Sequence, residues 1–273
     1  MNHSLTLRSV RMFAASTLLL AMFSLSTLGN HSWGNYHWAR TSNPFTLRVV
    51  DSNSSNWDSA LGTAVSDWSS SSVMNLIIEA GDDSTRTRKQ CRMVAGKIRS
   101  CNAAYGFNGW LGLASINISG SHITQATSKM NDSYLSSGYT STNRQHVMCQ
   151  EIGHDFGLDH QDESGADLNT CMDYDDALGN PSPNAHDYAQ LETIYSHLDS
   201  STTIASLMFG TNSGFGDDPD AEHNWGQLVR QSANGRSSVY ARLNNDGTRT
   251  LRHVFWTREA AQNCHSCDHR YDH

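Results

Sequence analysis

The sequence has few charged residues, and almost no lysine among them. Charged residues make up 17% of its 273 residues, and the formal net charge is −8. A chain with this acidic balance gives no electrostatic reason to expect a nucleic-acid partner. The chain also lacks the G-x-S-x-G, G-x-x-x-x-G-K-[ST] and G-x-G-x-x-G motifs. These absences argue against serine hydrolases of the elbow type, phosphate-loop enzymes and dinucleotide-binding enzymes.

Long apolar runs are also missing, apart from one near the start of the chain. Residues 12–29 are largely apolar and follow Arg8 and Arg11, which is typical of an export signal over residues 1–29. We expect cleavage after Gly29, with Thr27 at the −3 position. A membrane anchor is the alternative, but the run is short and interrupted by serine and threonine. The chain is therefore expected to be secreted, extracellular or periplasmic, with no membrane association after cleavage.

The most informative stretch covers residues 146–160 and reads H-V-M-C-Q-E-I-G-H-D-F-G-L-D-H. Gln150 and His154 are one helical turn apart, so their side chains lie on one face of a predicted helix. Gly157 can adopt a positive φ and end that helix, which would let His160 approach the same point. An apolar row would face the core, formed by Met148, Ile152 and Phe156. The stretch predicts a buried helix with a polar face and a converging third side chain.

This stretch resembles the zinc-binding string H-E-x-x-H-x-x-G-x-x-H, with Gln150 at the first histidine. Downstream, the tetrapeptide C-M-D-Y at residues 171–174 resembles a Met-turn of the M-x-Y form. On these motifs the chain resembles the metzincin zinc endopeptidases, of the matrixin, astacin and serralysin kind. The resemblance implies an α+β zincin fold with a twisted mixed sheet, an active-site helix, a Met-turn and a C-terminal helix.

The same resemblance implies roles for individual residues. Zinc would be held by Gln150, His154 and His160. Glu151 would act as general base toward a metal-activated water during hydrolysis of a peptide bond. Tyr174 would donate a hydrogen bond to the developing oxyanion. Met172 would form a structural floor under the metal and would not bind it.

Gln150 is the departure from the family string. Its Oε1 lies three bonds from Cβ, as Nε2 does in histidine, and the amide is neutral like imidazole. An amide oxygen is nevertheless a harder and weaker zinc donor than imidazole. Two interpretations stay open: a Gln-His-His zinc site, or a degenerate site that keeps the fold without the metal. His146 lies about 12 Å from His154 along a helix axis, so we expect it to neighbour the site or lie at the surface.

Six cysteines in an exported chain predict oxidised pairs. Cys91 and Cys101 flank a short polar stretch that suits a hairpin staple. A bond between Cys149 and Cys171 would lock the Met-turn beneath the zinc helix. Cys264 and Cys267 form a C-x-x-C for which a local disulfide, a frayed tail and a metal site with His269 and His273 are the alternatives.

An acidic group follows the Met-turn methionine. It consists of Asp173, Asp175 and Asp176. A solvated acidic loop is the expected interpretation, with a structural calcium site as the alternative.

Periodicity predicts the remaining elements. Strands are expected at 45–51, 73–79, 110–118, 122–130, 237–243 and 249–256. A helix from Ser55 would join the first two strands as a parallel β-α-β unit. Residues 80–107 are polar and expected to form a loop or hairpin. Asn184 caps a second helix, whose expected apolar stripe is Tyr188, Leu191, Ile194, Tyr195 and Leu198.

Three parts of the chain follow from these elements. Residues 1–29 are the signal peptide, 30–200 the metzincin-like catalytic domain, and 201–273 a linker with a small C-terminal β-hairpin extension. In metzincins an edge strand lines the cleft and pairs with an extended substrate, and residues 112–114 are compatible with that role. The isolated histidines are expected to be surface or satisfied interior residues; they are His122, His186, His197, His223 and His253.

The leading hypothesis is a secreted, monomeric zinc-dependent endopeptidase with a protein or peptide substrate. No cysteine-switch prosegment separates the signal from the catalytic region, so we expect activity without prodomain removal. The alternative is a catalytically inactive metzincin-like pseudoprotease that binds peptides or proteins. A third hypothesis is a secreted structural protein that uses the fold as a stable module.

Overall fold

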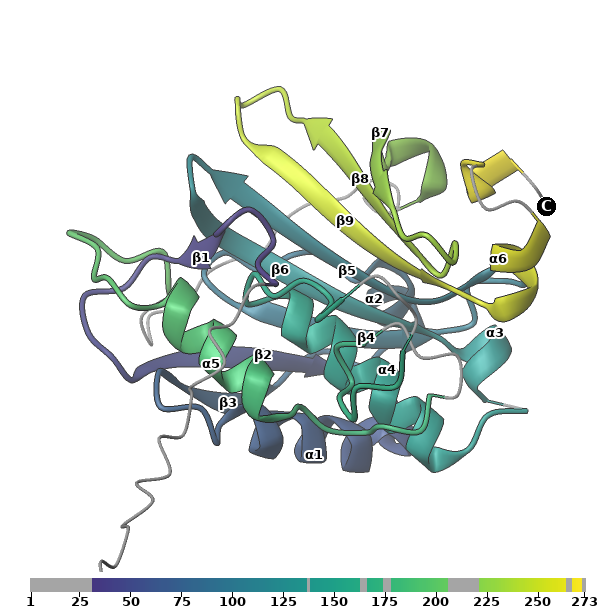
Figure 1. Cartoon of the computed structure of the whole chain (residues 1–273), viewed down its shortest axis with the longest axis horizontal. Helices are drawn as coiled ribbons and strands as arrows, with labels where there is room; N and C mark the ends of the chain where they lie inside the picture. Colours follow the sequence, from purple (N-terminus) through teal and green to yellow (C-terminus); the bar gives the residue numbers. More distant parts are fainter. Residues whose placement is uncertain are drawn as a thin grey trace, which may run out of the picture.

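The computed structural model contains one mixed β-sheet with its main helices on one face, as the α+β prediction requires (Figure 1). It describes residues 31–136, 138–162, 166–173, 178–205, 221–263 and 267–271. The predicted signal peptide, Tyr174, Asp175 and Asp176 lie outside these residues. Among the helices described, none is long and apolar enough to cross a membrane.

Nine strands form the sheet in the order β3-β2-β4-β6-β5-β9-β8-β7, with β1 paired to β6. The strands are β1 (His37–Trp38), β2 (Phe45–Ser52), β3 (Met74–Ala80), β4 (Ile98–Ala103), β5 (Trp110–Ser119), β6 (His122–Asn131), β7 (Gln227–Gln231), β8 (Ser237–Leu243) and β9 (Arg249–Trp256). Strands β2, β3, β4 and β6 run parallel, and β5, β9, β8 and β7 continue the sheet in antiparallel fashion. The C-terminal extension is thus part of the same sheet.

Helices α1 and α4 pack against each other. The α-helices are α1 (Asp58–Trp68), α2 (Thr85–Gln90), α3 (Asp132–Leu135), α4 (Ser141–His154), α5 (Ala185–Ile194) and α6 (Arg258–Asn263). The 3-10 turns are η1 (Ser55–Trp57), η2 (Glu222–Asn224) and η3 (His269–Tyr271). Helices α1, α4 and α5 cover one face of the sheet (Figure 1).

The predicted β-α-β opening is confirmed, because β2 and β3 pair in parallel across α1. The prediction for residues 80–107 is wrong in part, since they contain α2 and the buried strand β4 between β2 and β6. Strand β4 carries mostly polar side chains, so the spacing of apolar residues does not reveal it. Its Ser100 hydroxyl accepts a hydrogen bond from Asn53 at 3.0 Å, and Asn102 donates one to the Ser54 hydroxyl at 3.0 Å. Partnered polar groups can be buried at little cost.

Helix α4 is buried along most of its length. Thr140 and Asn143 form a capping box at its start, and its expected apolar row is fully buried. The chain leaves the helix through Gly157, whose φ is 91°. A Cβ at this position would lie 1.9 Å from the Tyr36 carbonyl oxygen, so only glycine fits. The predicted glycine turn is therefore present.

Helix α5 begins as predicted, with the Asn184 side chain accepting hydrogen bonds from the backbone of His186 and Asp187. It ends at Ile194, and the stripe does not extend to Leu198, which is 56% exposed. The predicted disulfides between Cys91 and Cys101 and between Cys149 and Cys171 are present. Cys267 is also disulfide-bonded, while Cys264 lies outside the described residues.

Strands β8 and β9 form the predicted C-terminal hairpin, and β9 pairs with β5. The expectation that β5 is an edge strand is therefore wrong: its outer side is occupied by β9. On the sheet face away from α4, the hairpin builds a small apolar cluster of its own, formed by Trp110, Leu113, Trp225, Tyr240, Val254, Trp256 and Ala260. Burial of these aromatic residues holds the hairpin on the sheet.

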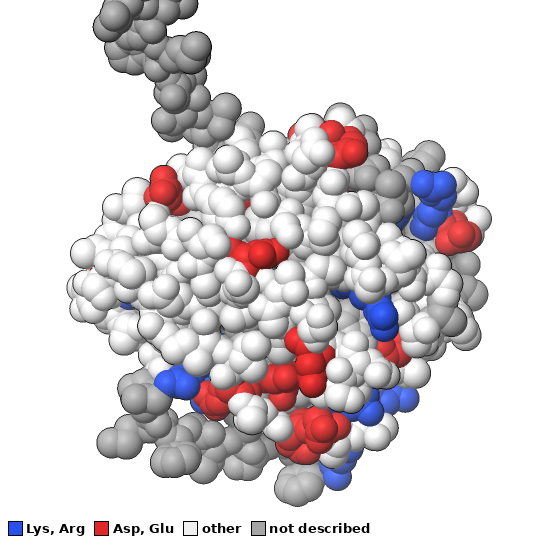
Figure 2. All heavy atoms as spheres, turned by 90° about the horizontal axis from the view of Figure 1, so that it is seen from below, with Lys and Arg blue, Asp and Glu red and all other residues white. Residues whose placement is uncertain are grey.

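Charged side chains are sparse on the molecular surface. Figure 2 shows that uncharged residues cover most of the side seen from below, with carboxylates gathered in one region and basic groups near them. This distribution agrees with the low charged fraction of the sequence.

Candidate metal centre

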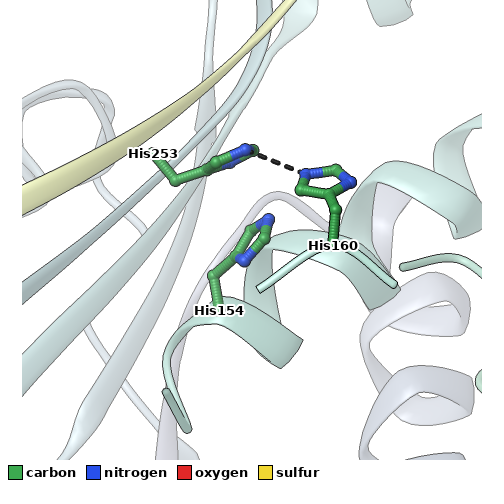
Figure 3. A group of neighbouring side chains, drawn as sticks. All are labelled: His154, His160 and His253. Atoms are coloured by element: carbon green, nitrogen blue, oxygen red, sulfur yellow. Dashed lines mark hydrogen bonds between the residues drawn. The ribbon is translucent and has the colours of Figure 1, made fainter. Parts of the chain in front are cut away.

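Three histidines converge between the end of α4 and the sheet (Figure 3). His154 comes from the last turn of α4, His160 from the segment after Gly157, and His253 from β9. Nε2 of His160 lies 2.9 Å from Nε2 of His253, and the rings of His154 and His253 have centroids 3.7 Å apart. One potential ligand atom from each histidine lies within 4.8 Å of the other two.

Backbone carbonyls fix the tautomers of two of these histidines. Nδ1 of His154 donates to the Leu158 carbonyl at 2.9 Å, and Nδ1 of His160 donates to the Asp173 carbonyl at 3.1 Å. A carbonyl only accepts, so each neutral ring keeps a lone pair at Nε2. This arrangement is the one that metal-binding histidines use, because the second nitrogen orients the ring.

All three rings are removed from water. Their relative exposures are 1% for His154, 4% for His160 and 1% for His253. Burial lowers the pKa of His154 to about 4 and lowers the pKa of the other two well below the ordinary value. Neutral imidazoles are the protonation state that binds a metal. Nε2 of His154 has no hydrogen-bond partner among the described residues, so a buried lone pair points at this cluster unpaired.

The donor set suits zinc. Imidazole is a preferred ligand of zinc and related first-row divalent ions, and three histidines with an open position form a known type of catalytic zinc site. A bound metal would be a partner for Nε2 of His154, which is buried away from water and has no hydrogen bond among the described residues. The residues present therefore fit a metal ion.

Glu151 lies beside the three histidines. Its Oε2 is 3.7 Å from Nδ1 of His253, and the residue is fully buried. Burial raises its pKa well above the ordinary value, the Asp155 charge acts in the same direction, and the Ala114 backbone N–H opposes both. A Cβ on Gly112 would lie 2.3 Å from Glu151 Oε1, so glycine in β5 makes room for the carboxylate.

Gln150, the predicted first ligand, is directed to other partners. Its Nε2 donates to the Cys171 carbonyl at 3.0 Å and lies 3.5 Å from Nε2 of His146. Its Oε1 has no hydrogen-bond partner among the described residues. The structure thus groups His154 and His160 with His253, and Gln150 ties α4 to the Met172 segment. His146 is fully buried, which excludes the surface alternative, and neighbours Gln150.

Met172, the expected floor under the metal, packs against α4. It is fully buried, and a Cβ on Gly153 would lie 2.6 Å from its Sδ, so the methionine packs directly against α4 next to His154. The Cys149–Cys171 disulfide joins this segment to the same helix. Asp173 is buried and accepts hydrogen bonds from the Leu168 N–H and the Asn180 amide. It is thus a structural residue in a folded loop.

Strand β9 closes the site. His253 is the register partner of Ala114, and Phe255 is the partner of Gly112, so β9 runs over the part of β5 that was expected to pair with a substrate. On the other side, the Trp33 ring packs edge-on against His154, with centroids 5.9 Å apart. The cluster therefore lies between the hairpin and the N-terminal segment.

The sequence interpretation missed His253, which was taken as an isolated histidine. Alternation along β9 carried the signal, because Leu251, His253 and Phe255 share the face of the strand that points toward the main core. A histidine flanked by apolar residues on a core-facing row is a candidate for a buried polar site. What the sequence did not indicate was which strand β9 pairs with.

A scan against protein-family models finds no match for this chain, and a search of curated proteins finds none either. The functional argument therefore depends on the chain's own residues.

Proposed function

We propose that this chain is a secreted zinc-dependent endopeptidase of metzincin-like architecture, held closed in its resting form by its own C-terminal hairpin. The single observation that carries the proposal is the convergence of three buried, neutral imidazoles beside the Glu151 carboxylate at the end of α4. His154, His160 and His253 are the residues that would hold the metal in this form. The two disulfides agree with export.

When bound, zinc supplies a Lewis acid that polarises a peptide carbonyl. Glu151 takes the proton of the attacking water and passes it to the leaving amine. Gly112 leaves space for that carboxylate against β5. Met172 and the Cys149–Cys171 disulfide fix the helix and the loop that carry His154 and His160.

Catalysis requires the hairpin to leave β5, because β9 occupies the strand edge that an extended peptide would use. His253 departs with β9. Gln150 then lies one helical turn before His154, with an Oε1 that has no hydrogen-bond partner in the described part of the chain. It is the residue in position to replace His253. The expectation was activity without prodomain removal; here a C-terminal segment must first be displaced.

A second candidate is a catalytically inactive protein in which the metal only joins the hairpin to α4. Burial favours it, because the three histidines are at most 4% exposed and β9 pairs along β5. In that case the fold would serve as a metal-stabilised module, and any peptide binding would also need the hairpin to move.

Peptide hydrolysis by the zinc-loaded chain tests the proposal. Glu151→Gln should retain the metal and lower turnover by about 10²–10⁴-fold, because it removes the general base. Turnover that survives this change would overturn the mechanism. Glu79→Gln, in a carboxylate on the far strand β3, is the matched control.

Two further variants test the closure. Cutting the chain at a protease site inserted between residues 205 and 221 lets the hairpin dissociate as a separate piece, so turnover should rise. Asn117 and Thr250 are register partners on β5 and β9 with side-chain oxygens 3.5 Å apart, so cysteines there should form a lock that abolishes turnover. A chain that binds zinc and stays inactive after the cut would establish the second candidate.

A further inference from the structure

A second group of histidines lies at the other end of the N-terminal segment. Its core is formed by His37, His197 and Asp199, and His122 adjoins the same Asp199 carboxylate; these four residues are hereafter the rim cluster. His37 belongs to β1, His122 begins β6, and the other two follow α5. His37 and His122 are register partners in the parallel pairing of β1 with β6, which places their side chains on one face. Three separate parts of the chain therefore meet at one carboxylate.

The distances within the rim cluster match those between ligands of one metal ion. Oδ1 of Asp199 lies 3.4 Å from His37 Nε2, 3.2 Å from His122 Nε2 and 3.7 Å from His197 Nε2. Nε2 of His197 lies 3.2 Å from Nε2 of His37. Ligands at the usual zinc distances in a tetrahedral site are about 3.3 Å apart. The ligand atoms of His37, His197 and Asp199 have the spacing of such a site, and His122 approaches the same Asp199 oxygen.

The tautomer of His37 leaves a lone pair toward the cluster. Its Nδ1 donates to the Asn35 carbonyl at 2.9 Å, so Nε2 of the neutral ring carries no proton. That bare nitrogen faces the Asp199 carboxylate, which can only accept. Two acceptors at this distance need either a proton on His37 or a cation between them. With Asp199 and His197 as further ligands, a divalent cation satisfies these groups.

Arg40 orients the carboxylate without occupying the oxygen that faces the histidines. Its backbone N–H and its Nη1 donate to Oδ2 of Asp199 at 3.1 and 2.9 Å. Oδ1 is left for the rim cluster. Hydrogen bonding of one carboxylate oxygen in this way fixes the direction of the other, as partners of metal ligands commonly do.

The rim cluster combines a buried base with an open side. His37 and the Asp199 side chain are 3% and 9% exposed, whereas the His197 side chain is 54% exposed. The buried pair is preorganised, and an ion can enter past His197. We propose that the rim cluster is a second divalent-metal site of the zinc class, separate from the candidate centre at His154, His160 and His253.

This second site would be structural. It would join β1 and β6 to the segment after α5, and β1 continues from the segment in which Trp33 packs against His154. A metal at the rim cluster thus holds the N-terminal segment over the first site. Metal binding at the rim cluster does not depend on peptidase activity.

Metal content of the full chain tests the proposal. After zinc loading and dialysis, the chain and the His223→Ala control should hold two equivalents, and His197→Ala should hold one. His223 is an exposed histidine of η2. In a zinc titration of His197→Ala, the binding phase of the rim cluster should be about 100-fold weaker than in the wild type.

Equal metal content in all three proteins would overturn the proposal and leave His37 protonated against Asp199 as the explanation. His122→Gln is the second variant, because His122 is partly exposed and its replacement keeps the fold; it should weaken the same phase. Cobalt loading should give tetrahedral absorption bands that His197→Ala reduces. One equivalent in the wild type and none in His197→Ala would support the rim site while removing the buried one.

Discussion

The buried histidine centre and the rim cluster use the same side chain under opposite conditions. At the buried centre, three imidazoles are almost completely removed from water, and the nearby carboxylate belongs to a proposed base. At the rim, one carboxylate is shared by three imidazoles, and one of them opens to solvent. The first depends on β9, which comes from the end of the chain, and the second depends on β1 and β6. Of the two groups, only the buried centre includes a residue of the hairpin, His253, so only this centre should change when the hairpin moves.

The strongest way to break this comparison is to remove His253. His253→Ala should weaken metal binding at the buried centre by at least about 100-fold, since one of three ligands is lost. The rim cluster should keep its equivalent, because its residues come from β1, β6 and the segment after α5. Elemental analysis and zinc titration measure both sites in one sample. An unchanged metal content, with the fold intact by circular dichroism, would show that another residue completes the buried centre.

A third group contrasts with both, because it prefers a proton. Asp187 Oδ1 lies 3.3 Å from His31 Nε2, and burial raises the pKa of Asp187 to about 6, with the Asp173 charge acting in the same direction. Burial lowers the pKa of His31 to about 4, so this ring is neutral above that pH and offers no opposing charge. The folded state therefore holds the Asp187 proton more tightly than the unfolded state.

The sign of the pH effect follows. A folded pKa above the unfolded value of 3.8 stabilises the fold fully below about pH 4, and this stabilisation is lost as pH rises through about 6. The stabilisation of the folded state that is lost is about 3 kcal/mol. Asp187→Asn keeps the acceptor for Asn184 and Thr170 and removes the titration. Denaturant unfolding of metal-free protein between pH 4 and 7 should show the wild type losing this much relative to the variant, and parallel curves would refute it.

The smallest expected effect concerns Gln150. In the closed form Gln150→Ala should leave the metal content unchanged and cost about 1–3 kcal/mol, because the buried Cys171 carbonyl loses its donor. Gln150→His tests the same position with a better ligand. If Gln150→Ala instead removes one metal equivalent from the uncut chain, the amide is a true ligand of the buried centre and the comparison must be redrawn.

Much of the fold could be predicted because its elements carry regular patterns. The strands of the β-α-β unit, α4 with its glycine turn, the Asn184 cap and the β8–β9 hairpin all follow from apolar spacing and local capping. Strand β4 could not be predicted, because its buried polar side chains are satisfied by hydrogen bonds with residues distant in sequence. Local sequence does not contain those partners.

The candidate site divides in the same way. His154, His160, Glu151 and Met172 lie close in sequence and are positioned by one helix and one turn, so the motif predicted their neighbourhood. His253 lies 93 residues after His160, and its place depends on β9 pairing with β5 instead of another edge. Nothing local selects that pairing. The rim cluster escaped notice for the same reason, because the register of β1 on β6 creates it.

Arg230 of β7 forms an ion pair with Asp159, and the Asp159 carboxylate also accepts the backbone N–H of His160 at 2.9 Å. An ion pair thus joins β7 to the loop that carries His160, in addition to the pairing of β9 with β5. The Arg230 side chain is 39% exposed, so dissolved salt weakens this ion pair. Higher ionic strength should therefore weaken the link between β7 and the loop that carries His160.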